Sequence, residues 1–219
     1  RSPVSRSKIP THRIPVAAGS PSRPERPIYL DHHATTPLDA RVLEAMLPYL
    51  QDEFGNAAST THVYGWRAEA AVEDARERLA EMVGARSPNE IVFTSGATES
   101  NNLAILGLAE AQVRRRHVVT VETEHPSVLD TCRALARRGF ELTELKVDAS
   151  GLISPQAVAD AIRGETFLVS VMAANNEIGV LQPIAEIAAL CRDRDIVFHS
   201  DAAQAVGKIA IDVEAQGVA

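Results

Sequence analysis

Polar and ionisable side chains follow directly after several short apolar runs of this 219-residue chain. The runs lead into "TSGATESNN", "ETEHPS", "AANNEIG" and "HSDAAQ", which contain Thr98, His125, Asn176 and Asp201. In sheets whose parallel strands alternate with helices, ligands bind at the carboxyl ends of the strands. We therefore expect these side chains to converge on one crevice.

The first of these corners has the features of a phosphate site. Gly96 and Ala97 let the backbone come close to a ligand, and Thr98 offers a hydroxyl. The first N–H groups of a helix that begins at about Glu99 would point outward with the positive end of the helix dipole. The corner lacks the GxxxxGK[ST] and GxGxxG patterns, so a nucleotide is not favoured. A tight strand-to-helix turn without a ligand is the alternative of equal weight.

The other strand-end residues each allow a structural and a functional interpretation. Asp201 could cap the next helix, or it could hold a cationic ring nitrogen, because a carboxylate in a low-dielectric crevice favours a protonated partner. His125 could cap a helix, or act as an aromatic plate and proton carrier. Asn175 and Asn176 could form a turn. Each structural interpretation is at least even by itself, but the four corners taken together favour a binding site.

Three histidines of the N-terminal loops, His32, His33 and His62, raise the question of a metal. No HxH or HExxH spacing accompanies them, so metal binding is the minor alternative.

The two cysteines are far apart and form no CxxC pair, which argues against a zinc ribbon or a redox dithiol. Cys132 and Cys191 both fall in step with apolar neighbours on predicted helices. We expect them to be small buried hydrophobic residues in a reducing compartment.

Hydrophobic periodicity predicts alternating strands and helices, hence an α/β fold with a mostly parallel sheet and helices on both faces. Ser154 before Pro155 predicts a helix start with a hydroxyl cap, and Gly84 and Gly139 predict helix ends. The predicted helices are about Leu38–Leu50, Val63–Val83, Glu99–Arg114, Ser127–Arg138, Pro155–Ile162 and Pro183–Asp193. The predicted strands are Ile91–Phe93, Val118–Val121, Leu142–Val147, Phe167–Met172 and Ile196–His199.

Charge divides the chain into a basic tail and an acidic body. The net charge is -7, yet residues 1–27 hold six basic residues and one acidic residue. The acidic body argues against a nucleic-acid groove, and no apolar run approaches the roughly 18 residues of a membrane span. The Pro- and Ser-rich tail is typical of disorder, and its composition also suits an organellar transit segment. The compartment is thus the cytoplasm or, alternatively, the mitochondrion. Because the first residue is Arg1, we expect the true start to be missing.

Six segments resemble one family in order and spacing. They are "YLDHHATTP", "FGNAASTTH", "IVFTSGATESNN", "TEHPSVLDTC", "NNEIG" and "HSDAAQAVGKI". They are similar to the cysteine desulfurases, which are class V members of the aspartate-aminotransferase fold of pyridoxal-phosphate (PLP) enzymes. The resemblance covers about Ile28 to Val218. It implies a fold-type I PLP-dependent transferase large domain over residues 28–219, incomplete at its C-terminus, after a disordered tail at residues 1–27.

The resemblance also implies roles for individual residues. The Ala97 amide and the Thr98 hydroxyl would hold the cofactor phosphate. His125 would stack on the pyridine ring and transfer protons, and Asp201 would pair with the pyridinium nitrogen.

Two amide side chains complete the implied site: Gln204 would bond the phenolic oxygen, and Asn176 would lie where the substrate carboxylate arrives. The implied reaction converts L-cysteine to L-alanine and an enzyme persulfide. The implied partners are a sulfur-acceptor or scaffold protein of iron–sulfur assembly and a second copy of the chain in a homodimer, with no nucleic acid and no membrane.

Two groups of that machinery have no match in these residues. The family's cofactor-bound lysine follows the DAAQ motif by a little over twenty residues, beyond Ala219, and its nucleophilic cysteine belongs to a later loop. Lys146 and Lys208 stand at other positions. The resemblance therefore implies an N-terminal fragment that is inactive alone. A selenocysteine lyase, another class V lyase or a catalytically silent truncated product is the alternative.

Overall fold

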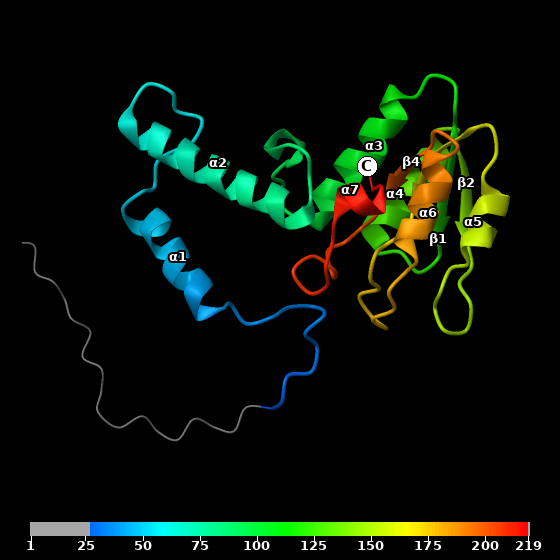
Figure 1. Cartoon of the computed structure of the whole chain (residues 1–219), viewed down its shortest axis with the longest axis horizontal. Helices are drawn as coiled ribbons and strands as arrows, with labels where there is room; N and C mark the ends of the chain where they lie inside the picture. The colour runs from blue at the N-terminus through cyan, green and yellow to red at the C-terminus, as the bar shows by residue number, and fades with distance from the viewer. Residues whose placement is uncertain (1–26, 219) are drawn as a thin grey trace, which may run out of the picture. The chain divides into compact units, whose positions relative to one another are not determined.

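The structure is a computed structural model that describes residues 27–218 (Figure 1). The chain divides into two units, Arg1–His32 and His33–Ala219. In the described part of the first unit, the ring of Tyr29 meets that of His32 edge-on, with 5.1 Å between centroids. Except for Pro27, the predicted basic tail lies outside the described residues.

The second unit alternates helices and strands along most of its length. Among the described residues its order is α1 (Ala40–Gln51), α2 (Val63–Val83), η1 (Pro88–Glu90), α3 (Ala97–Ala111), β1 (His117–Val121), α4 (Pro126–Arg137), β2 (Glu141–Leu145), α5 (Pro155–Ala161), β3 (Thr166–Ser170), α6 (Ile184–Arg192), β4 (Val197–His199) and α7 (Val213–Gln216).

The four strands form one sheet in the order β2-β1-β3-β4, and every neighbouring pair is parallel. Val119 of β1 lies opposite Thr143 of β2 and Val169 of β3, and Val169 lies opposite Phe198 of β4. All four carboxyl ends therefore meet at one edge of the sheet. This is the edge at which the polar residues were expected.

Helices cover both faces of the sheet (Figure 1). Side chains alternate between the two faces of a strand, so neighbouring valines of β1 enter different cores. Val119 packs in a cluster with Val158 of α5 and Ile187 of α6. Val118 packs in a second cluster with Ile105 of α3 and Val128 of α4. The predicted parallel α/β architecture is confirmed.

Local sequence explains where several helices begin and end. Gly84 ends α2 in the left-handed conformation, with a φ of 70°, and a Cβ added there would lie 2.6 Å from the Asp212 carboxylate. Gly139 follows α4 with a φ of 85°. Ser154 precedes Pro155 at the start of α5 as predicted, but its hydroxyl makes no capping hydrogen bond, so the predicted hydroxyl cap is wrong.

The predicted strand Ile91–Phe93 is absent from the described structure. These residues form no regular element, and they pair with no strand of the described chain. Val92 and Phe93 are 65% and 49% exposed. A β-branched run becomes a strand only when a neighbouring strand accepts its backbone hydrogen bonds, and here the Ile91 carbonyl receives the Arg76 guanidinium instead.

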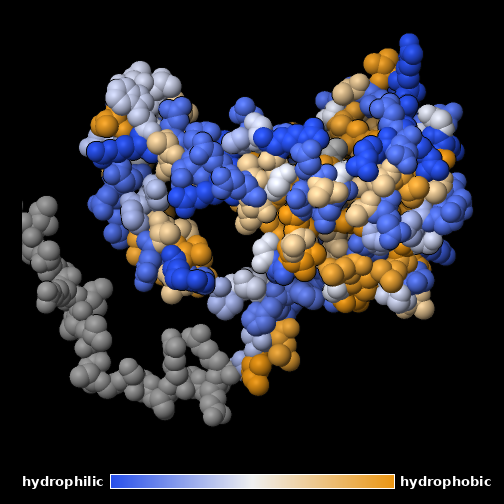
Figure 2. Space-filling model, in the orientation of Figure 1, coloured by the Kyte–Doolittle hydropathy of each residue, from blue (hydrophilic) through white to orange (hydrophobic). Residues whose placement is uncertain are grey.

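The apolar stripe of α1 is exposed. This helix buries none of its residues, and Val42, Leu43 and Met46 are 46%, 44% and 43% exposed. Figure 2 likewise shows apolar side chains at the surface among hydrophilic ones. Across residues 27–218, no helix is both long and apolar enough to span a bilayer.

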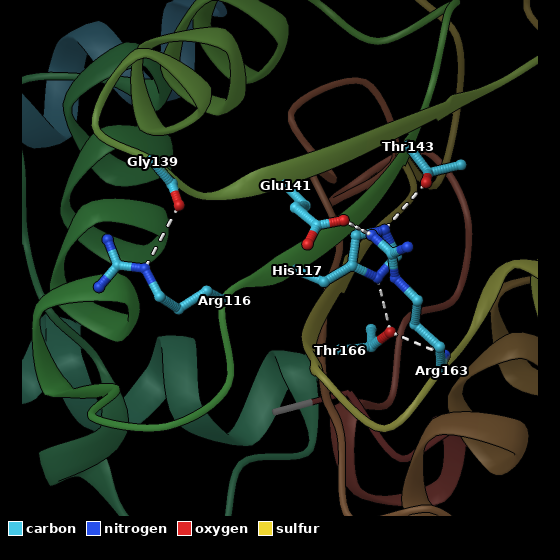
Figure 3. A network of polar contacts seen from close by, with 7 residues as sticks. All are labelled: Arg116, His117, Gly139, Glu141, Thr143, Arg163 and Thr166. Atoms are coloured by element: carbon cyan, nitrogen blue, oxygen red, sulfur yellow. Dashed lines mark hydrogen bonds and ion pairs between the residues drawn. The ribbon is translucent and has the colours of Figure 1, made fainter.

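A buried histidine links three strands toward the opposite, amino-terminal edge of the sheet (Figure 3). Nδ1 of His117 on β1 lies 2.7 Å from the Thr166 hydroxyl on β3, and Nε2 lies 2.9 Å from the Thr143 hydroxyl on β2. Glu141 and Arg163 form an ion pair beside it. Burial lowers the pKa of His117, so the neutral ring joins three strands here.

Candidate active site

The corner at residues 94–100 presents a helix start with free N–H groups. Gly96 precedes α3 with a φ of 156° and provides no side-chain cap. Ala97 and Thr98 begin the helix and are exposed. Within residues 27–218, no acceptor is recorded for their backbone N–H groups. An anion placed here would be met by these donors and by the positive end of the helix dipole.

Neighbouring side chains fix the shape of this corner. The hydroxyl of Thr94 lies 2.7 Å from that of Ser100, and the carboxylate of Glu99 accepts from the Ser95 N–H at 2.6 Å. The hydrogen bond from Ser95 lowers the pKa of Glu99, so Glu99 is held as an anion that closes the turn. Hydrogen bonds within the chain therefore hold the corner in shape.

A chain of side-chain hydrogen bonds joins the strand ends to α3. The amide nitrogen of Asn101 donates to Oδ2 of Asp201 at 2.8 Å and to the Ser127 hydroxyl at 2.9 Å. The Ser127 hydroxyl lies 2.8 Å from Nδ1 of His125. This Asp201–Asn101–Ser127–His125 relay connects the residue that follows β4 with the residue that precedes α4. Asn101, Ser127 and Asp201 are buried, whereas the His125 ring is exposed.

His125 caps α4 through Nδ1, and its Nε2 makes no hydrogen bond within the described chain. The Ser127 N–H donates to Nδ1 at 3.2 Å, so His125 is the N-cap of α4. Because a backbone N–H can only donate, Nδ1 is the acceptor and the neutral ring carries its proton on Nε2. The ring is therefore oriented, with a proton-bearing nitrogen left for a ligand.

Asp201 caps a turn, where the sequence allowed a helix cap, and its possible contact with a cationic ring nitrogen stays a prediction. Its Oδ1 accepts from the Ala203 N–H at 3.0 Å, which caps the following turn. Its Oδ2 accepts from Asn101. A carboxylate has about four lone-pair positions, so acceptor capacity remains for a cationic partner.

The two asparagines after β3 differ in role. Asn175 is buried, and its Oδ1 accepts from the N–H groups of Glu177 and Ile178 at 2.8 and 2.9 Å. It forms the turn. Asn176 is half-buried, and its side chain makes no hydrogen bond within residues 27–218.

Gln204 is half-buried and is held from two sides. Its amide nitrogen donates to the His33 carbonyl at 2.9 Å, and its oxygen accepts from Lys208 at 2.6 Å. Among the described residues, no hydrogen bond joins Gln204 or Asn176 to the relay, so their predicted cofactor contacts stay predictions. Thr98 and His125, in contrast, line one surface cavity of about 460 Å³ together with residues of α4.

Sequence reasoning missed three residues of this region. Asn101 and Ser127 stand within the quoted motifs, but nothing in their spacing shows that an amide on α3 would reach both α4 and the turn after β4. Glu124 is the third residue that was not predicted. Glu124 as a residue is 5% exposed, and burial, with a smaller contribution from the charge of Asp201, raises the pKa of its carboxyl to about 8. A carboxylate directly before a motif histidine was the available signal.

Both cysteines are buried free thiols, as predicted. Burial raises the pKa of Cys132 to about 12 and that of Cys191 to about 11. Neither is a thiolate at neutral pH. No cluster of three or more His, Cys, Asp or Glu residues within positions 27–218 is arranged to hold a metal.

Comparison with known proteins agrees with this fold and these motifs. Residues 28–219 match the family described as "Aminotransferase class-V", so the chain belongs to the class-V aminotransferase family.

Within this family, the chain is similar to proteins named as cysteine desulfurases. The chain is 57% identical over 194 residues to "Cysteine desulfurase, mitochondrial" of Drosophila melanogaster, covering 88% of this chain and 42% of the relative. It is also 57% identical over 193 residues to "Cysteine desulfurase IscS" of Anaeromyxobacter sp. (strain K), covering 88% of this chain and 48% of the relative. The chain therefore spans about half the length of these relatives.

Solved structures show the same architecture. The structure described as "SspA in complex with cysteine" superposes with a TM-score of 0.83 at 44% identity, over 87% of this chain and 55% of that chain. The structure described as "NIFS-LIKE PROTEIN" gives a TM-score of 0.83 at 38% identity, over 87% and 53%.

Proposed function

We propose that this chain forms the cofactor-binding part of a PLP-dependent cysteine desulfurase, which takes sulfur from L-cysteine and leaves L-alanine and an enzyme persulfide. The observation that supports this most is the relay that joins Asp201, through Asn101 and Ser127, to His125. It brings a carboxylate and an imidazole, from positions far apart in the sequence, to the helix that begins at the anion-binding corner. The relatives named as cysteine desulfurases support the same reaction.

The donor set fits the chemical parts of PLP. The phosphate needs hydrogen-bond donors, which the start of α3 supplies through Ala97 and Thr98. A protonated ring nitrogen needs an anion, which Asp201 supplies. A planar ring needs a flat partner, and His125 is exposed and fixed in orientation. When bound, PLP supplies the electron sink for chemistry at the substrate's α-carbon.

The chain's own residues then have separate tasks. Asp201 would keep the ring nitrogen protonated, and the relay would hold that carboxylate in place. His125 would stack on the ring and present its Nε2 proton. Gln204 would bind the phenolic oxygen, and Asn176 would meet the substrate carboxylate.

The two remaining groups of the reaction are not found among the residues described. Cys132 and Cys191 are buried as neutral thiols, so neither can attack sulfur. Lys208 is held at Gln204, and Lys146 follows the edge strand β2. We infer that this chain alone binds the cofactor weakly and does not turn over cysteine. The sulfur acceptor of iron–sulfur assembly and the homodimer belong to the same proposal, as does a cytoplasmic or mitochondrial location.

The test is a PLP titration of the chain, followed by its absorbance and fluorescence. Asp201→Asn should weaken binding by about tenfold, the effect of losing one charged contact of about 1.4 kcal/mol. The control is Asp160→Asn on α5. It replaces a carboxylate that is not part of the candidate site, so the affinity for PLP should be unchanged. Equal affinities for the chain and Asp201→Asn would contradict the proposal. Sulfide and alanine should not exceed the background of free PLP with cysteine.

A further inference from the structure

Two carboxyl groups share the buried region at the carboxyl end of the sheet. Glu124 follows β1 and is 5% exposed, and Asp201 follows β4 and is 9% exposed. Asp201 is close enough for its charge to raise the pKa of Glu124. Two carboxylates that lie near each other in a buried region cannot both ionise readily. Their hydrogen bonds decide which of them carries the charge.

The donors around the two groups are unequal. Asp201 accepts a hydrogen bond on each oxygen, from Asn101 at 2.8 Å and from the Ala203 N–H at 3.0 Å. Glu124 accepts on Oε1 only, from the Met172 N–H at 2.5 Å. Its Oε2 is buried and has no partner within residues 27–218. Donors stabilise an anion, so Asp201 is the better place for the negative charge.

The other titratable groups nearby do not compensate a charge on Glu124. The Cys132 thiol on α4 is close enough that Glu124 contributes to its raised pKa, and that thiol is neutral. His199 on β4 is close enough to Asp201 for that charge to raise its pKa, but burial lowers the pKa more, so it too is neutral. His125, next in the chain, points its Nδ1 at Ser127. No cation is among the groups found around Glu124 in the described chain.

We propose that Glu124 is a positioning residue that stays uncharged, holds the ends of β1 and β3 together through Met172, and leaves Asp201 as the single anion beneath the cofactor ring. This inference rests on the proposed function for its link to PLP. A second negative charge here would fall on a buried carboxylate with one unpartnered oxygen and would oppose the anionic phosphate of the cofactor. Cofactor binding should therefore weaken as Glu124 ionises.

The first experiment follows the side-chain carboxyl carbon of Glu124 by NMR as the pH of the chain is raised. The signal is assigned by through-bond correlation from the backbone of Glu124. Its titration midpoint should lie between pH 7 and 9, in keeping with a Glu124 pKa of about 8. In Asp201→Asn the midpoint should fall, while burial keeps it above the ordinary range. A carboxyl group remote from Asp201 would not respond to the loss of its charge.

The second experiment measures PLP affinity at pH 7 and pH 9. Glu124→Gln keeps the shape, the acceptor for Met172 and the neutral state, so it should bind within about twofold of the unmodified chain at pH 7. Ionisation of a group with a pKa near 8 should weaken binding by the unmodified chain about tenfold more than binding by Glu124→Gln between these two pH values. The titration of free PLP is common to both proteins and cancels.

A Glu124 midpoint near pH 4.5, a midpoint unchanged in Asp201→Asn, or identical pH profiles for the two proteins would each overturn the inference. If PLP binds at neither pH while the Glu124 midpoint behaves as expected, the charge assignment stands and the proposed function fails. The NMR titration needs no folded variant at Glu124, so misfolding of Glu124→Gln leaves it intact.

Discussion

The side-chain amide of Asn101 lies 2.8 Å from Oδ2 of Asp201, although 100 positions separate the two residues. Its second hydrogen reaches the Ser127 hydroxyl at 2.9 Å. One amide therefore joins α3 to the start of α4 and to the turn after β4. The orientation of the amide is fixed, because a carboxylate accepts and only the nitrogen can donate.

Replacing Asn101 with alanine should remove both bonds at once. Asp201 and Ser127 are buried, so groups left without partners should lower the free energy of unfolding by about 1–3 kcal/mol. Chemical denaturation measures the loss. Asn89→Ala, at an exposed position within η1 (Pro88–Glu90), is the control and should change the free energy of unfolding little. A loss no greater than that of the control would show that the relay does not stabilise the site.

The relay predicts which nitrogen of His125 carries the proton. Nδ1 accepts from the Ser127 N–H, so the neutral ring should be the Nε2–H tautomer. Nitrogen-15 NMR of the ring distinguishes the two tautomers. Ser127→Ala removes the hydroxyl and keeps the backbone donor, so it should weaken this preference without reversing it. A ring protonated mainly on Nδ1 would contradict the hydrogen-bond assignment.

The parts of the site that the sequence predicted are those governed by topology. Parallel strands place their ends at one edge, so Asp201 and His125 could be assigned to the same region from motif order alone. Asn101 could not, because the partner of a helical amide depends on how α3 packs against α4. The predicted strand Ile91–Phe93 was wrong for a related reason. β-branched residues favour a strand, but a strand forms only where a neighbouring strand pairs with it.

Stability should depend on pH through His117 at the other edge of the sheet. Burial is the main cause that lowers its pKa in the folded state, and the positive charge of Arg163 adds to it. The pKa in the unfolded chain is ordinary, about 6.5. The neutral ring therefore stabilises the fold above pH 6.5, and this stability is lost as the pH falls toward the depressed folded value.

The measurement is the free energy of unfolding between pH 7.5 and pH 5, for the chain and for His117→Gln. The variant should be less stable at pH 7.5, because three strands lose their common partner, and its stability should fall less steeply on acidification. His32→Gln, in the other unit, should keep the slope of the unmodified chain. Parallel curves for the chain and His117→Gln would show that His117 is not the titrating group.

The cysteines should resist alkylation in the native state. Burial raises the pKa of Cys132 to about 12 and that of Cys191 to about 11, so at pH 7.5 both are thiols shielded from reagent. Iodoacetamide followed by mass spectrometry should find neither modified in the folded chain and both modified after denaturation. Rapid labelling of either residue under native conditions would contradict its burial.

The central claim is that loops distant in sequence form one PLP site, and backbone NMR during a PLP titration tests it most directly. The amide signals of Thr98, His125 and Asp201 should shift together and fit one dissociation constant, while those of His117 and Thr166 at the opposite edge stay in place. Inorganic phosphate alone should move the Thr98 signal and leave that of Asp201 unchanged. Shifts confined to one loop, separate dissociation constants, or no shift at Asp201 would contradict the account.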